Sequence, residues 1–131
     1  MIKVFLVDDH EELAHVLREA LESEFCVVGV AGSGEALLVE APKLSPQVIV
    51  LDVSLPGMSG IEAAEHVKTM MPEVKIVMLS MHSANEYVEE ALKAGASGYV
   101  VKSSGVTELM HAIREVQAGN EYLSPSLHKR S

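Results

Sequence analysis

Short runs of apolar residues alternate along the chain with longer segments in which apolar positions recur every three or four residues. The runs are rich in β-branched residues and too short for helices, which indicates strands buried on both faces of a sheet. We expect five such strands, over residues 2–7, 25–30, 47–51, 74–79 and 98–101.

The longer segments have the pattern of amphipathic helices. Ser59 with Glu62, and Ser83 with Glu86, have the spacing of capping boxes and mark two helix starts. Strands alternating with helices of this length favour right-handed βαβ units and a parallel sheet covered on both faces. The expected helices cover residues 10–23, a short stretch around 36–41 that Pro42 ends, a segment beginning at Ser59, residues 84–94, and residues 105–118.

The last twelve residues break this alternation. They contain the apolar pair Tyr122-Leu123, a proline at 125 and a basic group at 128–130. We therefore expect residues 1–119 to form one domain and residues 120–131 to form a C-terminal tail. A linker toward a further domain and a short disordered terminus both fit these letters.

Composition narrows the class of protein. The 131 residues include 19 Asp+Glu and 10 Lys+Arg, and this net charge of −9 argues against direct binding of nucleic acid. The apolar runs are far shorter than the ~18–20 residues that cross a bilayer, and Asp8 and Asp9 interrupt the first one, so it is no signal peptide. A single cysteine, Cys26, excludes an internal disulfide and favours a reducing compartment. We expect a cytoplasmic protein that has no contact with membranes.

Polar residues follow four of the five predicted strands. Asp8 and Asp9 follow the first, Asp52 the third, Ser80 the fourth and Lys102 the fifth. Because the carboxyl ends of parallel strands meet at one edge, where open α/β sheets bind ligands, these side chains should converge. Three close carboxylates repel one another, and Mg²⁺ with its preference for oxygen ligands would relieve that repulsion. Such a pocket suits phosphoryl transfer, with Asp52 as the nucleophile.

Each of these residues also has a simpler interpretation. Asp9 and Glu12 have capping-box-like spacing, so Asp9 alone could serve only as a helix cap. Asp52 and Ser80 alone could be turn residues, and Lys102 a solvated lysine. The combination favours a site, because four separate loops would otherwise place suitable residues at one edge by accident. The six histidines show no zinc spacing, and the chain has no glycine-rich nucleotide loop.

Four motifs together resemble the receiver domain of two-component response regulators, over about residues 2–119. The DDH triplet, the GASGYVVK sequence and the tail NEYLSPSL resemble the NarL/FixJ (LuxR-type) class, whose members usually carry a C-terminal helix-turn-helix DNA-binding domain. No such domain follows within these 131 residues. The resemblance implies a flavodoxin-like (βα)5 doubly wound parallel sheet with strand order 2-1-3-4-5. The motifs are VDDH at 7–10, LDVSLPGMSG at 51–60, MLSMH at 78–82 and AGASGYVVKS at 94–103.

The resemblance also implies roles for the acidic residues. Asp52 would be the phosphoacceptor for a phosphoryl group from a sensor histidine kinase. Asp9, Asp52 and the backbone carbonyl of Ser54 would hold Mg²⁺, with Asp8 acting directly or through water. Lys102 would pair with the phosphoryl oxygens. The protein would thus be a signalling switch rather than an enzyme acting on external substrates.

Further roles concern the switch. Ser80 would hydrogen-bond the phosphoryl group, letting Tyr99 swing inward and remodelling the face formed by the last two predicted helices and the strand between them. The family uses that face for dimerisation or partner contact. Ser54 and His82 would flank the attacking water and tune the lifetime of the acyl phosphate. One departure from the family is Ser103, which stands where a proline in a cis bond often follows the lysine; a non-proline cis bond costs ~2.5–4 kcal/mol.

Three other functions stay open on the sequence alone. A Mg²⁺-dependent phosphohydrolase would use Asp52 on an external substrate, but no long insertion is present to enclose one. A flavodoxin-like FMN carrier would need a Ser/Thr/Gly-rich loop after the first strand, where this chain has Asp8-Asp9-His10-Glu11. A receiver domain that signals without phosphorylation would keep the same motifs.

Overall fold

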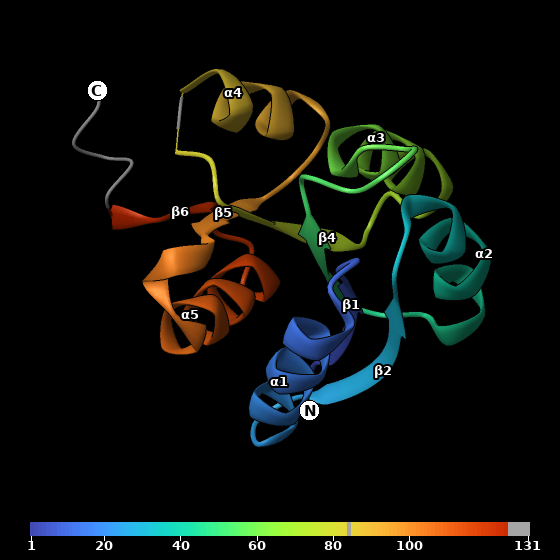
Figure 1. Cartoon of the computed structure of the whole chain (residues 1–131), viewed down its shortest axis with the longest axis vertical. Helices are drawn as coiled ribbons and strands as arrows, with labels where there is room; N and C mark the ends of the chain where they lie inside the picture. The colour runs from blue at the N-terminus through green and yellow to red at the C-terminus, as the bar shows by residue number, and fades with distance from the viewer. Residues whose placement is uncertain (84, 126–131) are drawn as a thin grey trace.

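The computed structural model describes residues 1–83 and 85–125, which form one parallel sheet with helices on both faces (Figure 1). The strand order is β2-β1-β3-β4-β5-β6, and every neighbouring pair is parallel. The order of the first five strands confirms the predicted flavodoxin-like arrangement. The strands are β1 (Lys3–Val7), β2 (Cys26–Ala31), β3 (Val48–Asp52), β4 (Lys75–Ser80), β5 (Gly98–Val101) and β6 (Tyr122–Leu123).

Helices cover the two faces unequally. On one face lie α1 (Glu11–Glu22) and α5 (Val106–Gln117); on the other lie α2 (Gly34–Leu44), α3 (Gly60–Met70) and α4 (Asn85–Lys93) (Figure 1). Side chains of a strand alternate between the faces. In β1, Val4 therefore joins the core beneath α1 and α5, while Phe5 joins the core beneath the other three helices. Because both faces are covered, the central strands are apolar between their end residues.

Two helices begin with serine caps, of which the Ser59 cap was predicted from the sequence and the Ser33 cap was not. The Ser59 hydroxyl accepts a hydrogen bond from the Glu62 N–H at 3.2 Å, as predicted for α3. The Ser33 hydroxyl caps α2 in the same way, accepting from Ala36 N–H at 3.1 Å. For α4, the expected first residue, Ala84, lies outside the described residues.

The prediction that Pro42 ends its helix was wrong, because α2 continues to Leu44. Proline lacks an N–H and so removes one intrahelical hydrogen bond, a modest loss within the last turn. The helix ends instead at Ser45, which has left-handed backbone geometry with φ 50°.

The sequence analysis missed two short elements near the end of the chain. A 3₁₀ turn, η1 (Lys102–Ser104), lies between β5 and α5, and β6 adds a sixth strand beside β5 (Figure 1). The basic group at 128–130 lies outside the described residues. Among the described helices, none is both long and apolar enough to span a bilayer.

Candidate functional site

Three carboxylates meet at the carboxyl edge of the sheet, as predicted from the strand ends. Asp8 directly follows β1, and Asp52 is the last residue of β3. Oxygens of Asp8, Asp9 and Asp52 and a ring nitrogen of His10 lie within 4.8 Å of one another. Every aspartate of the chain belongs to this cluster, whereas the remaining acidic residues are all glutamates.

Lys102 reaches the carboxylates from the end of β5. Its Nζ lies 2.9 Å from Asp52 Oδ2 and 3.4 Å from Asp8 Oδ2. Asp8 and Asp52 are each only 2% exposed. Strands β1, β3 and β5 thus bring two buried acids and one ammonium group into direct contact, although Lys102 lies 50 residues from Asp52 in the chain.

This contact sets the charge states at the site. Burial raises the pKa of Asp52, and hydrogen bonds from the Lys102 ammonium and the Ser54 N–H offset part of that rise. Burial works in the opposite sense on Lys102, but the hydrogen bond and charge of Asp52 and the charge of Asp8 outweigh it and raise the pKa of Lys102. The ammonium therefore stays charged, and further positive charge beside Asp52 would favour its ionised form.

Asp8 keeps one oxygen for a ligand. Its Oδ1 accepts the His10 N–H at 2.9 Å and lies 3.3 Å from His10 Nδ1, while its buried Oδ2 accepts no hydrogen bond from the described residues and faces only the Lys102 ammonium at 3.4 Å. Buried carboxylate oxygens are normally satisfied, so this one indicates space for a cation or water. Asp9 is not a helix cap, because α1 is preceded by His10 and has no side-chain cap. That interpretation of Asp9 was wrong.

The loop after β3 holds Asp52 in place. The Ser54 N–H donates to Asp52 Oδ1 at 2.9 Å, so each carboxylate oxygen has a separate partner. Gly60, at the start of α3, donates its N–H to Val53 at 2.9 Å and packs so closely that a Cβ would overlap the Asp52 carbonyl. The sequence analysis gave Gly60 no role, since only the folded loop reveals this close approach.

Ser80 ends β4 at the same edge, but its hydroxyl bonds the following loop rather than a carboxylate. It accepts the His82 N–H at 2.9 Å, and the Tyr99 hydroxyl donates to the His82 carbonyl at 2.8 Å. The Tyr99 ring is fully buried in this structure. Tyr99 thus already occupies the inward position that the sequence analysis associated with the switch.

His82 also connects two other parts of the site. Its Nε2 lies 3.5 Å from the Ser54 hydroxyl, and its ring stacks on Tyr87 of α4 with centroids 4.2 Å apart. Ser54 and His82 are therefore neighbours, as expected if both border the same approach to Asp52. The bond after Lys102 is trans, like every peptide bond of the described residues.

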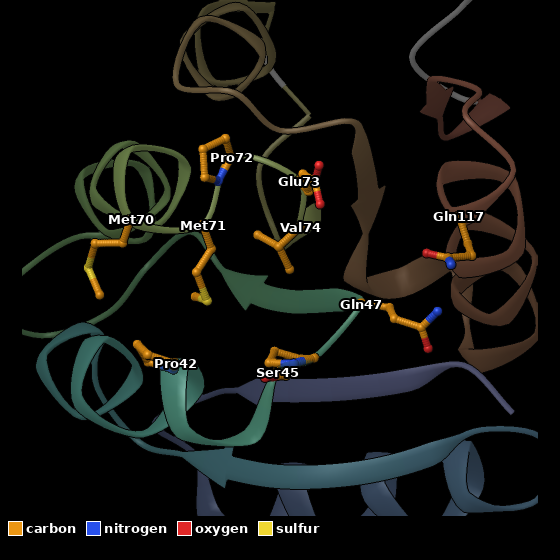
Figure 2. Close-up of a pocket in the computed structure, with 10 residues that line it drawn as sticks. Pro42, Ser45, Gln47, Met70, Met71, Pro72, Glu73, Val74 and Gln117 are labelled. Atoms are coloured by element: carbon orange, nitrogen blue, oxygen red, sulfur yellow. The ribbon is translucent and has the colours of Figure 1, made fainter.

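Two hollows of similar size lie at different places on the surface. One, of about 690 Å³, is lined by Lys102, His10 and Met81 beside the carboxylates. The other, of about 760 Å³, lies between α2 and the segment joining α3 to β4, where three prolines and two methionines dominate the lining (Figure 2). Lys102, which contacts Asp8 and Asp52, lines the first hollow, whereas Glu73 is the only charged group among the described residues that line the second.

Comparison with known proteins points to one family. The chain matches the response regulator receiver domain family over residues 4–114. It is 38% identical over 129 residues to the response regulator GacA of Pseudomonas syringae, covering 97% of this chain and 60% of that protein. It is 42% identical over 125 residues to the DNA-binding transcriptional activator DevR/DosR of Mycobacterium tuberculosis, covering 94% of this chain and 58% of that protein.

Solved structures agree with this assignment. A LuxR-family two-component response regulator from Aurantimonas sp. SI85-9A1 superposes with a TM-score of 0.93 at 33% identity, covering 97% of this chain and 92% of that one. The receiver domain of RcsB from Salmonella enterica, solved with the phosphomimetic BeF3⁻, has a TM-score of 0.89 at 28% identity, covering 98% and 96%.

The chain spans about 60% of the length of the curated relatives that it matches. Receiver domains are signalling switches rather than enzymes for external substrates, and the relative DevR/DosR is a DNA-binding transcriptional activator. The motif residues Asp8, Asp9 and Asp52 form the acidic pocket typical of that family. The chain belongs to the response regulator receiver domain family, in its LuxR-type (NarL/FixJ) class.

Proposed function

We propose that Asp52 is the phosphoacceptor of a two-component signalling pathway. An Asp52 carboxylate oxygen would attack the phosphorus of a phosphohistidine on a sensor histidine kinase. A P–O bond forms, the P–N bond breaks, and the departing imidazole nitrogen keeps the bonding electron pair and takes up a proton. The observation that carries this proposal is the contact of the buried Asp52 with Lys102, since that ammonium can neutralise the transferred phosphoryl oxygens.

The residues present fit a magnesium ion. Asp8 has a buried oxygen that accepts no hydrogen bond from the described residues, and one carboxylate oxygen each of Asp8, Asp9 and Asp52 lies within 4.8 Å of the others. We assign the ion to Asp8, Asp9, Asp52 and the backbone carbonyl of Ser54, with Asp8 acting directly or through water. When bound, Mg²⁺ supplies positive charge beside the phosphoryl oxygens. The oxygen-rich donor set matches its preference.

Ser80 and Tyr99 would transmit the phosphorylation of Asp52 to the surface formed by α4, β5 and α5. Phosphorylation would give the Ser80 hydroxyl a new partner, pulling on the loop that begins at His82. Tyr99 holds the same loop through the His82 carbonyl, so the inward ring and the displaced loop would stabilise each other. A phosphoryl group would then shift an existing equilibrium toward one arrangement of the surface formed by α4, β5 and α5.

Ser54 and His82 would set how long the acyl phosphate survives. The two side chains lie 3.5 Å apart on the loops that follow β3 and β4, and the His82 ring stacks on Tyr87. An attacking water would pass between them. Replacing both residues together with alanine should change the dephosphorylation rate of the labelled protein, and an unchanged rate would remove this role.

The output would be transcriptional. DevR/DosR is a DNA-binding transcriptional activator, and RcsB has been solved as dimers bound to DNA. We propose that residues 1–119 form a cytoplasmic receiver domain that dimerises on phosphorylation, and that residues 120–131 lead to a helix-turn-helix domain in the full-length protein. The acidic receiver would then contact DNA only through that domain.

Intact-mass measurement tests the central step. The chain is incubated with Mg²⁺ and acetyl phosphate, beside Asp52→Asn and the surface control Glu62→Gln. We expect a hydroxylamine-labile phosphoryl adduct on the parent chain and on the control, and none on Asp52→Asn. An adduct on Asp52→Asn, or none on the parent chain, would contradict the proposal; the second result would favour a receiver that signals without phosphorylation.

A further inference from the structure

The chain does not leave the sheet at the end of α5. After that helix it turns back, and β6 runs parallel to β5 along its outer edge (Figure 1). The Tyr122 N–H donates to the Ser97 carbonyl at 2.9 Å, and the Ser124 N–H donates to the Tyr99 carbonyl at 3.0 Å. These bonds join the segment to the strand that carries Tyr99.

Ser124 adds a bond that a two-residue strand cannot make with its backbone. Its side chain is fully buried, and its Oγ accepts the Val101 N–H at 3.0 Å. Since β6 ends at Leu123, the hydroxyl takes the place of the carbonyl that a longer strand would offer. A buried N–H without such a partner is costly, so this bond fixes the end of β5.

The end of β5 is where the site obtains its ammonium group. Val101 is the last residue of β5, and Lys102 follows it directly and begins the turn η1. The Lys102 Nζ lies 2.9 Å from Asp52 Oδ2, and a shift of the end of β5 would change that distance. On one side β5 is paired with β4 as far as Val101, but on the other side β6 is the edge of the sheet, so the Val101 N–H depends on Ser124 there.

The segment is also held from the helical side. The Tyr122 ring packs edge-on against the His111 ring of α5, with centroids 5.3 Å apart. Burial and the nearby charge of Glu108 raise the pKa of the Tyr122 hydroxyl, which keeps the side chain neutral. With β5 on one side and α5 on the other, residues 122–124 present the Ser124 hydroxyl to Val101 in one orientation.

We propose that Ser124 is a positioning residue of the Asp52–Lys102 site, acting through the Val101 N–H. The proposal rests on the phosphoacceptor function assigned above. Linked equilibria are reciprocal. A phosphoryl group on Asp52 that pairs with the Lys102 ammonium therefore also changes the strength of the hydrogen bond between the Val101 N–H and the Ser124 hydroxyl. Residues 122–124 thus respond to the site through the hydrogen bond at the end of β5.

The first test needs no phosphorylation. In the folded 131-residue chain, Ser124→Ala should speed amide hydrogen exchange at Val101 and shift the backbone resonances of Lys102. Val27→Ala, a core truncation in β2 at the opposite edge, serves as the control for general destabilisation. Unchanged Lys102 resonances in Ser124→Ala, or equal shifts in Val27→Ala, would overturn the proposal.

The second test measures the site itself. In the presence of Mg²⁺, Ser124→Ala should weaken binding of the phosphoryl analogue trifluoroberyllate about threefold to tenfold, the value of one hydrogen bond. Ser124→Thr, which keeps the hydroxyl, should bind within about twofold of the parent chain on the same scale. Equal binding by Ser124→Ala and the parent would overturn the positioning role. A parent chain that binds no trifluoroberyllate, with the resonance shifts present, would instead overturn the phosphoacceptor function.

Discussion

Replacing Lys102 with methionine removes the one lysine or arginine charge that contacts the buried acids among the described residues, while it keeps an unbranched side chain of similar length. In the parent chain, its Nζ lies 2.9 Å from Asp52 and 3.4 Å from Asp8, and the lysine side chain is only 12% exposed. Removing one partner of a buried ion pair leaves an uncompensated charge. We therefore expect Lys102→Met to be clearly less stable than the parent chain without Mg²⁺.

The loss of unfolding free energy in Lys102→Met has an upper limit. If the two carboxylates cannot both stay ionised, one protonates, and at pH 7 this costs about 1.4 kcal/mol for each unit between the pH and an ordinary carboxyl pKa of ~3.9. The loss is thus at most about 4 kcal/mol, and we expect about 2–4 kcal/mol. In the variant, the pKa of Asp52 rises further above its unfolded value. Stability is then fully present at low pH and falls as the pH rises through the shifted pKa.

Urea unfolding with and without Mg²⁺, between pH 5 and pH 8, measures the stability difference between the parent chain and Lys102→Met. The difference between parent and variant should grow with pH and shrink when Mg²⁺ is added, because the ion replaces the lost positive charge. The exposed Lys43 in α2 gives the control Lys43→Met, which should change stability by less than about 0.5 kcal/mol. Equal stability of Lys102→Met and the parent at pH 8 without Mg²⁺ would refute the reasoning.

Other predictions concern the metal, the loop after β3 and the switch. At ten times its dissociation constant, Mg²⁺ should stabilise the fold by about 1.4 kcal/mol and raise the Tm by roughly 5 °C, and Asp9→Asn should lose most of that rise in a thermal melt. Gly60→Ala should lose more than about 2 kcal/mol in urea unfolding, since its Cβ would overlap the Asp52 carbonyl; a smaller loss would mean that α3 can move aside. Tyr99→Phe should lose about 1 kcal/mol with the bond to His82, and an unchanged urea midpoint would contradict this.

The fold was predictable because its strands are buried on both faces. β3 is buried at all five positions, and its first four residues form a continuous apolar run that no amphipathic helix would show. The meeting of Asp8, Asp52 and Lys102 also followed from the sequence, since in a parallel sheet residues at strand ends share one edge whatever their separation in the chain. Periodicity and topology together therefore located the acidic cluster.

Features that depend on a single contact were not predictable. Two residues of β6 carry no periodicity, and the strand is defined only by its pairing with β5. Pro42 is a strong local signal for a helix end, but its missing N–H costs little near the end of α2. The crowding of Gly60 against Asp52 depends on how α3 meets the loop after β3. Each of these is decided by tertiary packing, which local sequence does not record.

The most direct test of the phosphoacceptor assignment is to locate the phosphoryl group by chemical trapping. The chain is treated with Mg²⁺ and acetyl phosphate, reduced with borohydride, which converts an aspartyl phosphate to homoserine, and digested for peptide mass spectrometry. We expect homoserine at position 52 and unmodified Asp8 and Asp9, with no conversion in a sample that lacks the donor. Homoserine at position 8 or 9, or a phosphoryl adduct that leaves Asp52 unreduced, would contradict the assignment.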